Sequence, residues 1–271
     1  FLYFYIFSYN MHLYKIDSSY FLSLCLMECF SKEVVKGKVI KRPSKHCKSP
    51  YVADVLLDDG REIISHAPSL GCSGLCEKDS IVYLSQLEKP KQCSHVIHLS
   101  EINNTIICIH PKNGEKIVEH CLKNNYITTL KDLKVIRREK KILNSRFDFL
   151  GIDKNNQYFI LEVKSVPLCK DGVSYFPEGY RKKKTDVISP RALKHIQELQ
   201  EIKFHCNDVR TIMCFVVQRS DSKTFKISDN DKIYKDAVFE AKNKGVELLA
   251  IQINWTKDGK GYFINEMNVE F

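Results

Sequence analysis

Short apolar segments separated by turn residues mark the first third of the chain. The segments expected to form strands are residues 34–40, 51–57, 61–66, 81–85 and 95–99. Asp58-Asp59-Gly60 is the clearest turn signal and predicts a hairpin between the second and third segments. Five short strands in this region predict a small OB-like β-barrel over residues 31–102.

The pattern changes after about residue 103. Helices are expected at residues 111–123, 190–202 and 231–244, the second of them capped by Ser189 with Pro190 at its first position. Strands are expected at residues 135–142, 146–152, 158–166, 211–217 and 246–255. This order of helices and strands predicts an α/β or α+β domain over residues 103–271.

Residues 1–30 form an uncertain apolar extension. The chain begins with Phe1, and Met27 is a plausible alternative start. Polar residues interrupt every apolar run before the roughly 18 residues that a membrane span needs, so no span is expected. No basic region precedes an apolar core, which argues against a secretory signal. A targeting segment, or a peripheral membrane contact supported by the positive charge of the chain, is the alternative.

The composition of the chain indicates the cellular compartment and the class of binding partner. Of the 271 residues 44% are hydrophobic, and the net charge of +9 suits nucleic acid or an anionic membrane surface. The eleven cysteines show no paired framework, which predicts free thiols in a reducing compartment, the cytoplasm or the nucleus. Zinc at Cys72, Cys76 and Cys93, with His95 nearby, is conceivable. Their spacing fits no common zinc motif, so buried free thiols are favoured.

Basic residues cluster at the start of the predicted barrel. Residues 31–50 contain seven lysines or arginines, among them Lys41 and Arg42, and one acidic residue, Glu33. On a small β-barrel such a cluster is a candidate nucleic-acid contact. A solvated charged face is the alternative.

The strand expected at residues 158–166 carries two charges on one face. Because side chains alternate along a strand, Glu162 and Lys164 point the same way. A short turn joins the preceding strand, so Asp148 can lie close to Glu162. Two neighbouring carboxylates repel unless a cation lies between them, and oxygen ligands favour Mg²⁺ or Mn²⁺. A lysine there can assist a metal-activated water, although a solvent-facing ion pair remains the alternative.

An aspartate, thirteen intervening residues and then Glu-x-Lys follow the pattern of PD-(D/E)xK nucleases. Further motifs occur in order around it: Lys41-Arg42-Pro43, Ala53-Asp54-Val55-Leu56-Leu57-Asp58-Asp59-Gly60-Arg61-Glu62, Ser145-Arg146-Phe147-Asp148-Phe149, Glu162-Val163-Lys164-Ser165-Val166, Tyr175-Phe176-Pro177 and Arg191-Ala192-Leu193-Lys194-His195. In this combination, residues 34–255 resemble the sugar fermentation stimulation protein A (SfsA) family.

The resemblance implies an OB-like barrel followed by a mixed-sheet, restriction-endonuclease-like domain. It also implies that Asp148 and Glu162 bind metal and that Lys164 is the catalytic lysine. By the same resemblance the helix with Arg191, Lys194 and His195 faces the site and contacts phosphate. A solvated helix face is the alternative for that helix.

Two segments depart from the family pattern. After His-x-Pro the family pattern has an Asn and a Thr-Gly-Arg-like run, whereas this chain has Ser69-Leu70-Gly71-Cys72 after His66-Ala67-Pro68. The stretch before Ser189 is longer than expected and contains the basic run Arg181-Lys182-Lys183-Lys184. This run is either a loop that grips DNA or a flexible charged loop.

Two functions compete on these grounds. The first is a Mg²⁺- or Mn²⁺-dependent phosphodiesterase acting on DNA, with RNA left open. The second is a non-catalytic DNA-binding regulatory protein of the same family. The chain has no Walker-type loop, dinucleotide-binding glycine pattern or nucleophile elbow that would indicate another chemistry.

Overall fold

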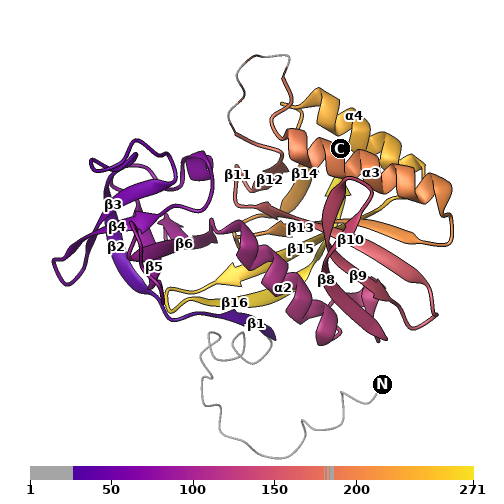
Figure 1. Ribbon diagram of the computed structural model, residues 1–271, viewed down its shortest axis with the longest axis horizontal. Coiled ribbons are helices and arrows are strands. Elements are labelled where there is room, and N and C mark those ends of the chain that lie inside the picture. Colours follow the sequence, from indigo (N-terminus) through magenta and orange to yellow (C-terminus); the bar gives the residue numbers. More distant parts are fainter. Residues whose placement is uncertain (1–26, 180, 182, 184–185) are drawn as a thin grey trace, which may run out of the picture.

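A barrel and a layered sheet domain lie side by side in the computed structural model, which describes residues 27–179, 181, 183 and 186–271 (Figure 1). Helix α2 lies near the junction of the two parts. Residues 1–26 of the predicted extension, together with Lys182 and Lys184 of the basic run, lie outside the described residues.

The barrel is closed by a pairing between the two strands at the ends of its strand order. The strand order is β4-β3-β2-β5-β6, and a parallel pairing of β4 with β6 completes the ring. The strands are β2 (Val35–Lys41), β3 (Val52–Leu57), β4 (Glu62–His66), β5 (Ile81–Gln86) and β6 (His95–Ile102). Alternate residues such as Val39, Val55 and Ile97 fill the interior and are fully buried. The predicted OB-like barrel is therefore confirmed.

A seven-stranded mixed sheet forms the second part, in the order β1-β16-β15-β13-β10-β9-β8. The central pairs β10–β13 and β13–β15 are parallel, and the outer pairs are antiparallel. The strands are β1 (Met27–Ser31), β8 (Val135–Ile142), β9 (Ser145–Ile152), β10 (Tyr158–Val166), β13 (Arg210–Val217), β15 (Glu247–Trp255) and β16 (Lys260–Met267). Strand β13 is an almost continuous apolar run because both faces of the sheet are covered.

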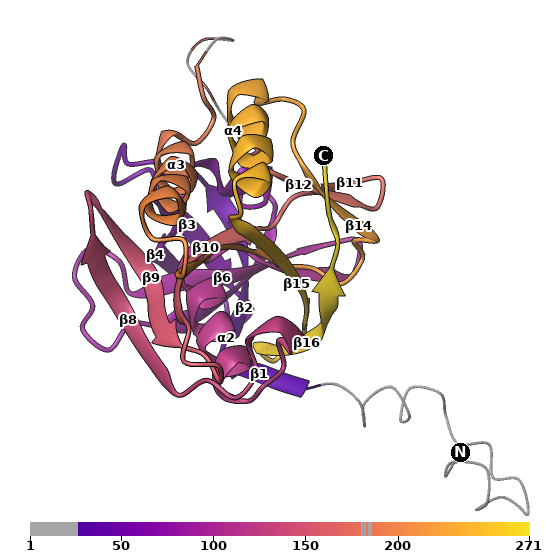
Figure 2. The same cartoon turned by 90° about the vertical axis from the view of Figure 1, so that its right-hand side faces the viewer.

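Helices cover the two faces of this sheet. Helix α2 (Pro111–Lys123) packs on one face, while α3 (Pro190–His205) and α4 (Lys232–Asn243) pack on the other (Figures 1 and 2). The Ser189 hydroxyl accepts a hydrogen bond from the Ala192 backbone N–H at 3.4 Å, so the predicted cap of α3 is confirmed. Asp231 caps α4 in the same way.

Three features of the sheets were not expected from the sequence. Strand β1 lies within the segment that was assigned to the extension and the start of the barrel, but it pairs with β16 of the second part. Strand β7 (Thr105–Cys108) lies beyond the predicted barrel boundary at residue 102, but it pairs with β6. A separate sheet has the order β11-β12-β14-β17, formed by β11 (Cys169–Lys170), β12 (Val173–Phe176), β14 (Thr224–Ile227) and β17 (Val269–Glu270).

Within the part of the chain that the structure describes, no helix is both long enough and apolar enough to cross a membrane. The described residues also include two short 3-10 turns, η1 (Gly71–Gly74) and η2 (Thr128–Leu130). The first of these turns overlaps residues 69–72, the segment that departs from the family pattern.

Candidate active site

Strands β9 and β10 bring the predicted acidic pair together. Their antiparallel register places Phe149 opposite Leu161, so Asp148 lies beside the start of the Glu162–Lys164 segment. The backbone N–H of Val163 donates a hydrogen bond to Asp148 Oδ2 at 2.7 Å. This bond fixes one carboxylate oxygen of Asp148 against the strand that carries Glu162.

Glu162 is buried among charged neighbours. Its side chain is 3% exposed, and its Oε1 atom accepts hydrogen bonds from Lys164 Nζ and from His195 Nδ1. When His195 Nδ1 donates its single proton to Glu162, it cannot also accept a hydrogen bond from Lys164. The 3.3 Å distance between Lys164 Nζ and His195 Nδ1 is therefore a packing contact. The Oε2 atom of Glu162 has no hydrogen-bond partner among the described residues.

The two carboxyl groups are perturbed in opposite directions. Burial raises the pKa of Asp148 to about 7, and repulsion by Glu162 adds to this effect. Burial also acts to raise the pKa of Glu162, but the His195 hydrogen bond and the charge of Lys164 outweigh it, so the pKa is lowered. Such a pair of carboxyls with divergent pKa values is typical of functional sites.

These side chains open onto a pocket of about 560 Å³ between the barrel and the sheet domain. Its lining includes Tyr51, Ser69 and Leu70 from the barrel, Glu115 from α2, Asp148, Glu162 and Lys164 from the sheet, and Ser189 and Arg191 at the start of α3. Glu115 is held by Arg138, with an Oε2 to Nη2 distance of 3.0 Å. No local pattern in the sequence indicates Glu115 or the barrel residues, because distant segments bring them to the pocket.

The residues predicted on α3 do not all point the same way. Arg191 is exposed and lines the pocket. Lys194 is also exposed, but its Nζ donates to the Asn144 carbonyl at 2.9 Å. His195 is only 3% exposed and forms a hydrogen bond with Glu162, and its contact with phosphate stays a prediction. The helix brings His195 behind the carboxylate, where it orients Glu162.

The other predicted basic residues are not among the described residues that line this pocket. Lys41 is exposed at the end of β2. Arg42 donates from Nε to the Pro50 carbonyl at 2.9 Å and from Nη2 to the Ser69 carbonyl at 2.8 Å. Arg181 donates to the Asn230 carbonyl at 2.8 Å, and Lys183 is exposed. Their contacts with nucleic acid stay predictions.

A divalent cation fits the acidic pair better than it fits the cysteines. Glu162 Oε2 is buried without a partner among the described residues, and a cation would relieve both this burial and the repulsion from Asp148. Within the described ranges, no group of three or more His, Cys, Asp or Glu side chains is arranged to hold a metal ion. Magnesium needs fewer protein ligands, since it binds through one or two carboxylates together with substrate phosphates. Cys72 and Cys76 are buried thiols of the barrel core.

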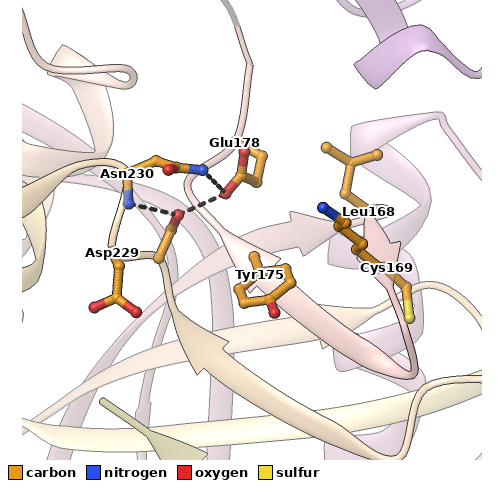
Figure 3. A pocket seen from close by; sticks show the side chains of 8 residues that line it. Leu168, Cys169, Tyr175, Glu178, Asp229 and Asn230 are labelled. Carbon is orange, nitrogen blue, oxygen red and sulfur yellow. Dashed lines mark hydrogen bonds between the residues drawn. The ribbon is translucent and has the colours of Figure 1, made fainter. Parts of the chain in front are cut away.

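A second pocket, of about 420 Å³, lies on the small sheet (Figure 3). Its carboxylate Glu178 accepts hydrogen bonds from the Ser228 hydroxyl at 2.5 Å and from Asn230 Nδ2 at 3.1 Å. Asp229, also in the lining, pairs with Lys235. The hydrogen bond and charge of Lys235 lower the pKa of Asp229, so this pocket lacks the carboxyl of raised pKa that marks the first.

The fold and the acidic site define a protein with an OB-like barrel and an endonuclease-like sheet domain. The family model described as the sugar fermentation stimulation protein RE domain (SfsA) matches residues 112–259. The chain is 32% identical to a sugar fermentation stimulation protein homolog of Brucella anthropi over 84% of this chain and 94% of that protein. A homolog from Brucella ovis is 31% identical over 85% of this chain and 92% of that protein. The chain therefore belongs to the SfsA family.

The fold has a solved counterpart. The structure of SfsA from Pyrococcus furiosus in complex with Ca²⁺ matches with a TM-score of 0.78 and 19% sequence identity. The match covers 90% of this chain and 100% of that one. It confirms the predicted order of an OB-like barrel followed by an endonuclease-like domain.

Proposed function

We propose that this protein is a divalent-cation-dependent phosphodiesterase that cleaves DNA at Asp148, Glu162 and Lys164. The observation that carries the proposal is the buried Oε2 atom of Glu162, which lacks a partner among the described residues and shares its pocket with Asp148. A buried carboxylate oxygen left in this state is costly unless a ligand binds there. The Ca²⁺ named for the Pyrococcus furiosus relative supports a hard cation as that ligand.

The protein groups divide the work by position. Asp148 and Glu162 would hold the cation, which when bound would activate a water and polarise a phosphoryl oxygen. Lys164 Nζ, held by Glu162, supplies positive charge where negative charge develops on the phosphate. Arg191 at the pocket wall offers a planar guanidinium for a phosphate oxygen pair.

The choice of DNA as substrate rests on charge and on shape. The net charge of +9 favours a polyanion, and the pocket between barrel and sheet domain is open to solvent beside exposed Arg191. The family model is described as an RE domain, which supports a nuclease-type fold for this part of the chain.

A second candidate function is DNA binding without cleavage. The observation in its favour is that Glu162 already bonds Lys164 and His195, so half of the acidic pair is neutralised without a metal. Such a protein would bind DNA in a salt-dependent manner that does not need a divalent cation.

The test is a cleavage assay on the full chain. Wild type, Asp148→Asn and the control Asp236→Asn, which alters an exposed carboxylate on α4, are incubated with single- and double-stranded DNA. Mg²⁺, Mn²⁺ and EDTA arms are run in parallel. We expect metal-dependent cutting by wild type and Asp236→Asn. In Asp148→Asn the cleavage rate should fall by more than about 100-fold, which exceeds the loss typical of residues that only orient a metal ligand. Full activity in Asp148→Asn would overturn the assignment, and binding without cutting by any form would favour the second candidate.

A further inference from the structure

One wall of the active-site pocket comes from the barrel and carries exposed apolar side chains. Tyr51, just before β3, is 42% exposed, and Leu70, just before η1, is 60% exposed. Both line the same pocket as Asp148 and Glu162. Single exposed apolar residues are ordinary on a protein surface, but two that face a charged pocket indicate a contact with an apolar part of a ligand.

Hydrogen bonds hold the backbone of this wall in place. Arg42 bridges its two segments by donating to the Pro50 carbonyl at 2.9 Å and to the Ser69 carbonyl at 2.8 Å. The backbone N–H of Ala67 donates to the Tyr51 carbonyl at 2.8 Å. The backbone on which Tyr51 and Leu70 stand is therefore fixed while their side chains stay open to the pocket.

A DNA strand bound for cleavage brings a charged group and an apolar group to such a pocket. Its phosphate would contact Lys164, Arg191 and the carboxylate pair, while the base attached to the neighbouring sugar would lie away from that phosphate. The flat face of a base stacks on aromatic and apolar side chains, and each such contact contributes about 1–3 kcal/mol. A base inside a continuous duplex has both faces covered by its neighbours, so it can reach Tyr51 only after leaving the stack.

The size of the pocket agrees with this ligand. Its volume of about 560 Å³ lies within the roughly 300–1,000 Å³ typical of pockets for small ligands, a class that includes one nucleotide. We propose that Tyr51 and Leu70 form a base-binding wall and that the substrate is single-stranded DNA or an unpaired nucleotide beside a duplex. Arg42 is a positioning residue for this wall. The inference rests on the proposed function, because it places the scissile phosphate at Asp148 and Glu162.

The experiment compares three substrates of one sequence: a single strand, a continuous duplex, and a duplex with one unpaired nucleotide. Wild type, Tyr51→Ala, Tyr51→Phe and Leu70→Ala are assayed as full chains with Mg²⁺ or Mn²⁺. The control Tyr158→Ala removes a tyrosine that is 56% exposed at the start of β10, outside the pocket. Thermal melting checks that each variant is folded.

We expect wild type to cut the single strand and the unpaired site faster than the continuous duplex. Tyr51→Ala should reduce cutting of those two substrates by about 5- to 150-fold, which corresponds to the loss of one stacking contact. Leu70→Ala should reduce it less, and Tyr51→Phe should recover most of the rate that Tyr51→Ala loses, because phenylalanine keeps the aromatic face. Tyr158→Ala, outside the pocket, should cut these substrates as wild type does. Wild type that prefers the continuous duplex, or Tyr51→Ala that leaves the preference unchanged, would overturn the base-binding wall. Loss of cutting in Asp148→Asn would at the same time show that the proposed function stands.

A binding arm separates the two ideas if no substrate is cut. A single strand that carries 2-aminopurine reports base stacking through its fluorescence, and it is titrated with each variant in EDTA. If wild type and Tyr51→Phe quench the fluorescence and Tyr51→Ala does not, Tyr51 stacks on a base even in a protein that binds DNA without cutting it. Equal quenching by wild type and Tyr51→Ala would overturn it.

Discussion

A buried carboxylate lies on a strand in each half of this protein, and the two differ in what surrounds them. Asp54 in the barrel is 1% exposed; its Oδ1 accepts from the Ser44 hydroxyl at 2.5 Å and its Oδ2 from the Lys45 backbone N–H at 2.8 Å. Glu162 in the sheet domain is 2% exposed, but only its Oε1 is engaged, while Oε2 has no partner among the described residues.

The difference shows that burial alone does not identify a functional carboxylate. Asp54 is satisfied by a hydroxyl and a backbone N–H of its own neighbourhood, which is the arrangement of a structural residue. Glu162 has one oxygen without a partner among the described residues, and it lies beside a second carboxylate, Asp148, whose pKa is raised to about 7 chiefly by burial. The predictions below test this contrast, beginning with the largest expected effect.

Removing the positioning histidine should impair the site without removing a metal ligand. In His195→Ala we expect cleavage to fall by about 10- to 100-fold, as is typical of residues that orient a ligand. The loss should be in kcat rather than in KM for DNA, because His195 is buried and bonds Glu162. His195→Asn places an amide N–H near the position of Nδ1 and should restore part of the rate. A larger effect on KM than on kcat would contradict this role.

Divalent cations should stabilise wild type through the acidic pair. At 100 times its dissociation constant, a cation raises the free energy of unfolding by about 2.7 kcal/mol. Melting with Mg²⁺ or Ca²⁺ should show this rise in wild type, and little of it in Asp148→Asn. Without metal, Asp148→Asn should melt above wild type because repulsion with Glu162 is removed. An equal cation shift in both proteins would place the cation elsewhere.

The barrel carboxylate should matter for stability and not for chemistry. Asp54→Ala leaves the Ser44 hydroxyl and the Lys45 N–H without their acceptor. We expect the free energy of unfolding to fall by about 1–3 kcal/mol, measured by urea denaturation, while the folded variant still cuts DNA. If the variant is folded but no longer cuts DNA, Asp54 is not purely structural, and the contrast with Glu162 does not hold.

Two stacked histidines at the junction of the halves should make the stability of the protein depend on pH. The rings of His98 and His110 are 5.0 Å apart, and burial lowers their pKa values to about 3 and about 4, with Lys116 contributing to both. The unfolded chain therefore binds more protons below its ordinary histidine pKa of about 6.5. Stability should fall as pH decreases from about 6.5 to 4, by up to about 1.4 kcal/mol per pH unit for each histidine.

The variant His98→Gln checks this assignment. Glutamine can keep a hydrogen bond to the Ser85 hydroxyl, which lies 2.9 Å from His98 Nε2, but it does not titrate. Urea denaturation of both proteins between pH 4 and 7 should give a shallower slope for the variant. Parallel curves would assign the acid sensitivity to other groups.

Much of the barrel and of the acidic strand could be predicted from local patterns. The alternation along residues 158–166 places Glu162 and Lys164 on one face, and the short turn before it brings Asp148 alongside. Both follow from the fixed two-residue period of a strand and from the reach of a tight turn. The helix that begins at Pro190 was also predictable, because Ser189 caps it through a contact three residues away.

Other features depend on contacts between distant segments. Strand β1 was assigned to the extension, yet it pairs with β16, which lies more than 200 residues later. The small sheet of β11, β12, β14 and β17 was not predicted, since its strands are two to four residues long and come from separate parts of the chain. Short strands carry too little alternation to be recognised before their partners are known.

The sequence by itself determined that Asp148, Glu162 and Lys164, the residues proposed to carry the chemistry, come together, because they lie within two neighbouring strands whose geometry is local. Only the tertiary structure decided what surrounds them. It turned His195 inward onto Glu162, brought Tyr51 and Leu70 from the barrel to the same pocket, and left Glu162 Oε2 without a partner among the described residues. The physical reason is that burial and the pairing of charges depend on packing between segments far apart in the chain, which no local period encodes.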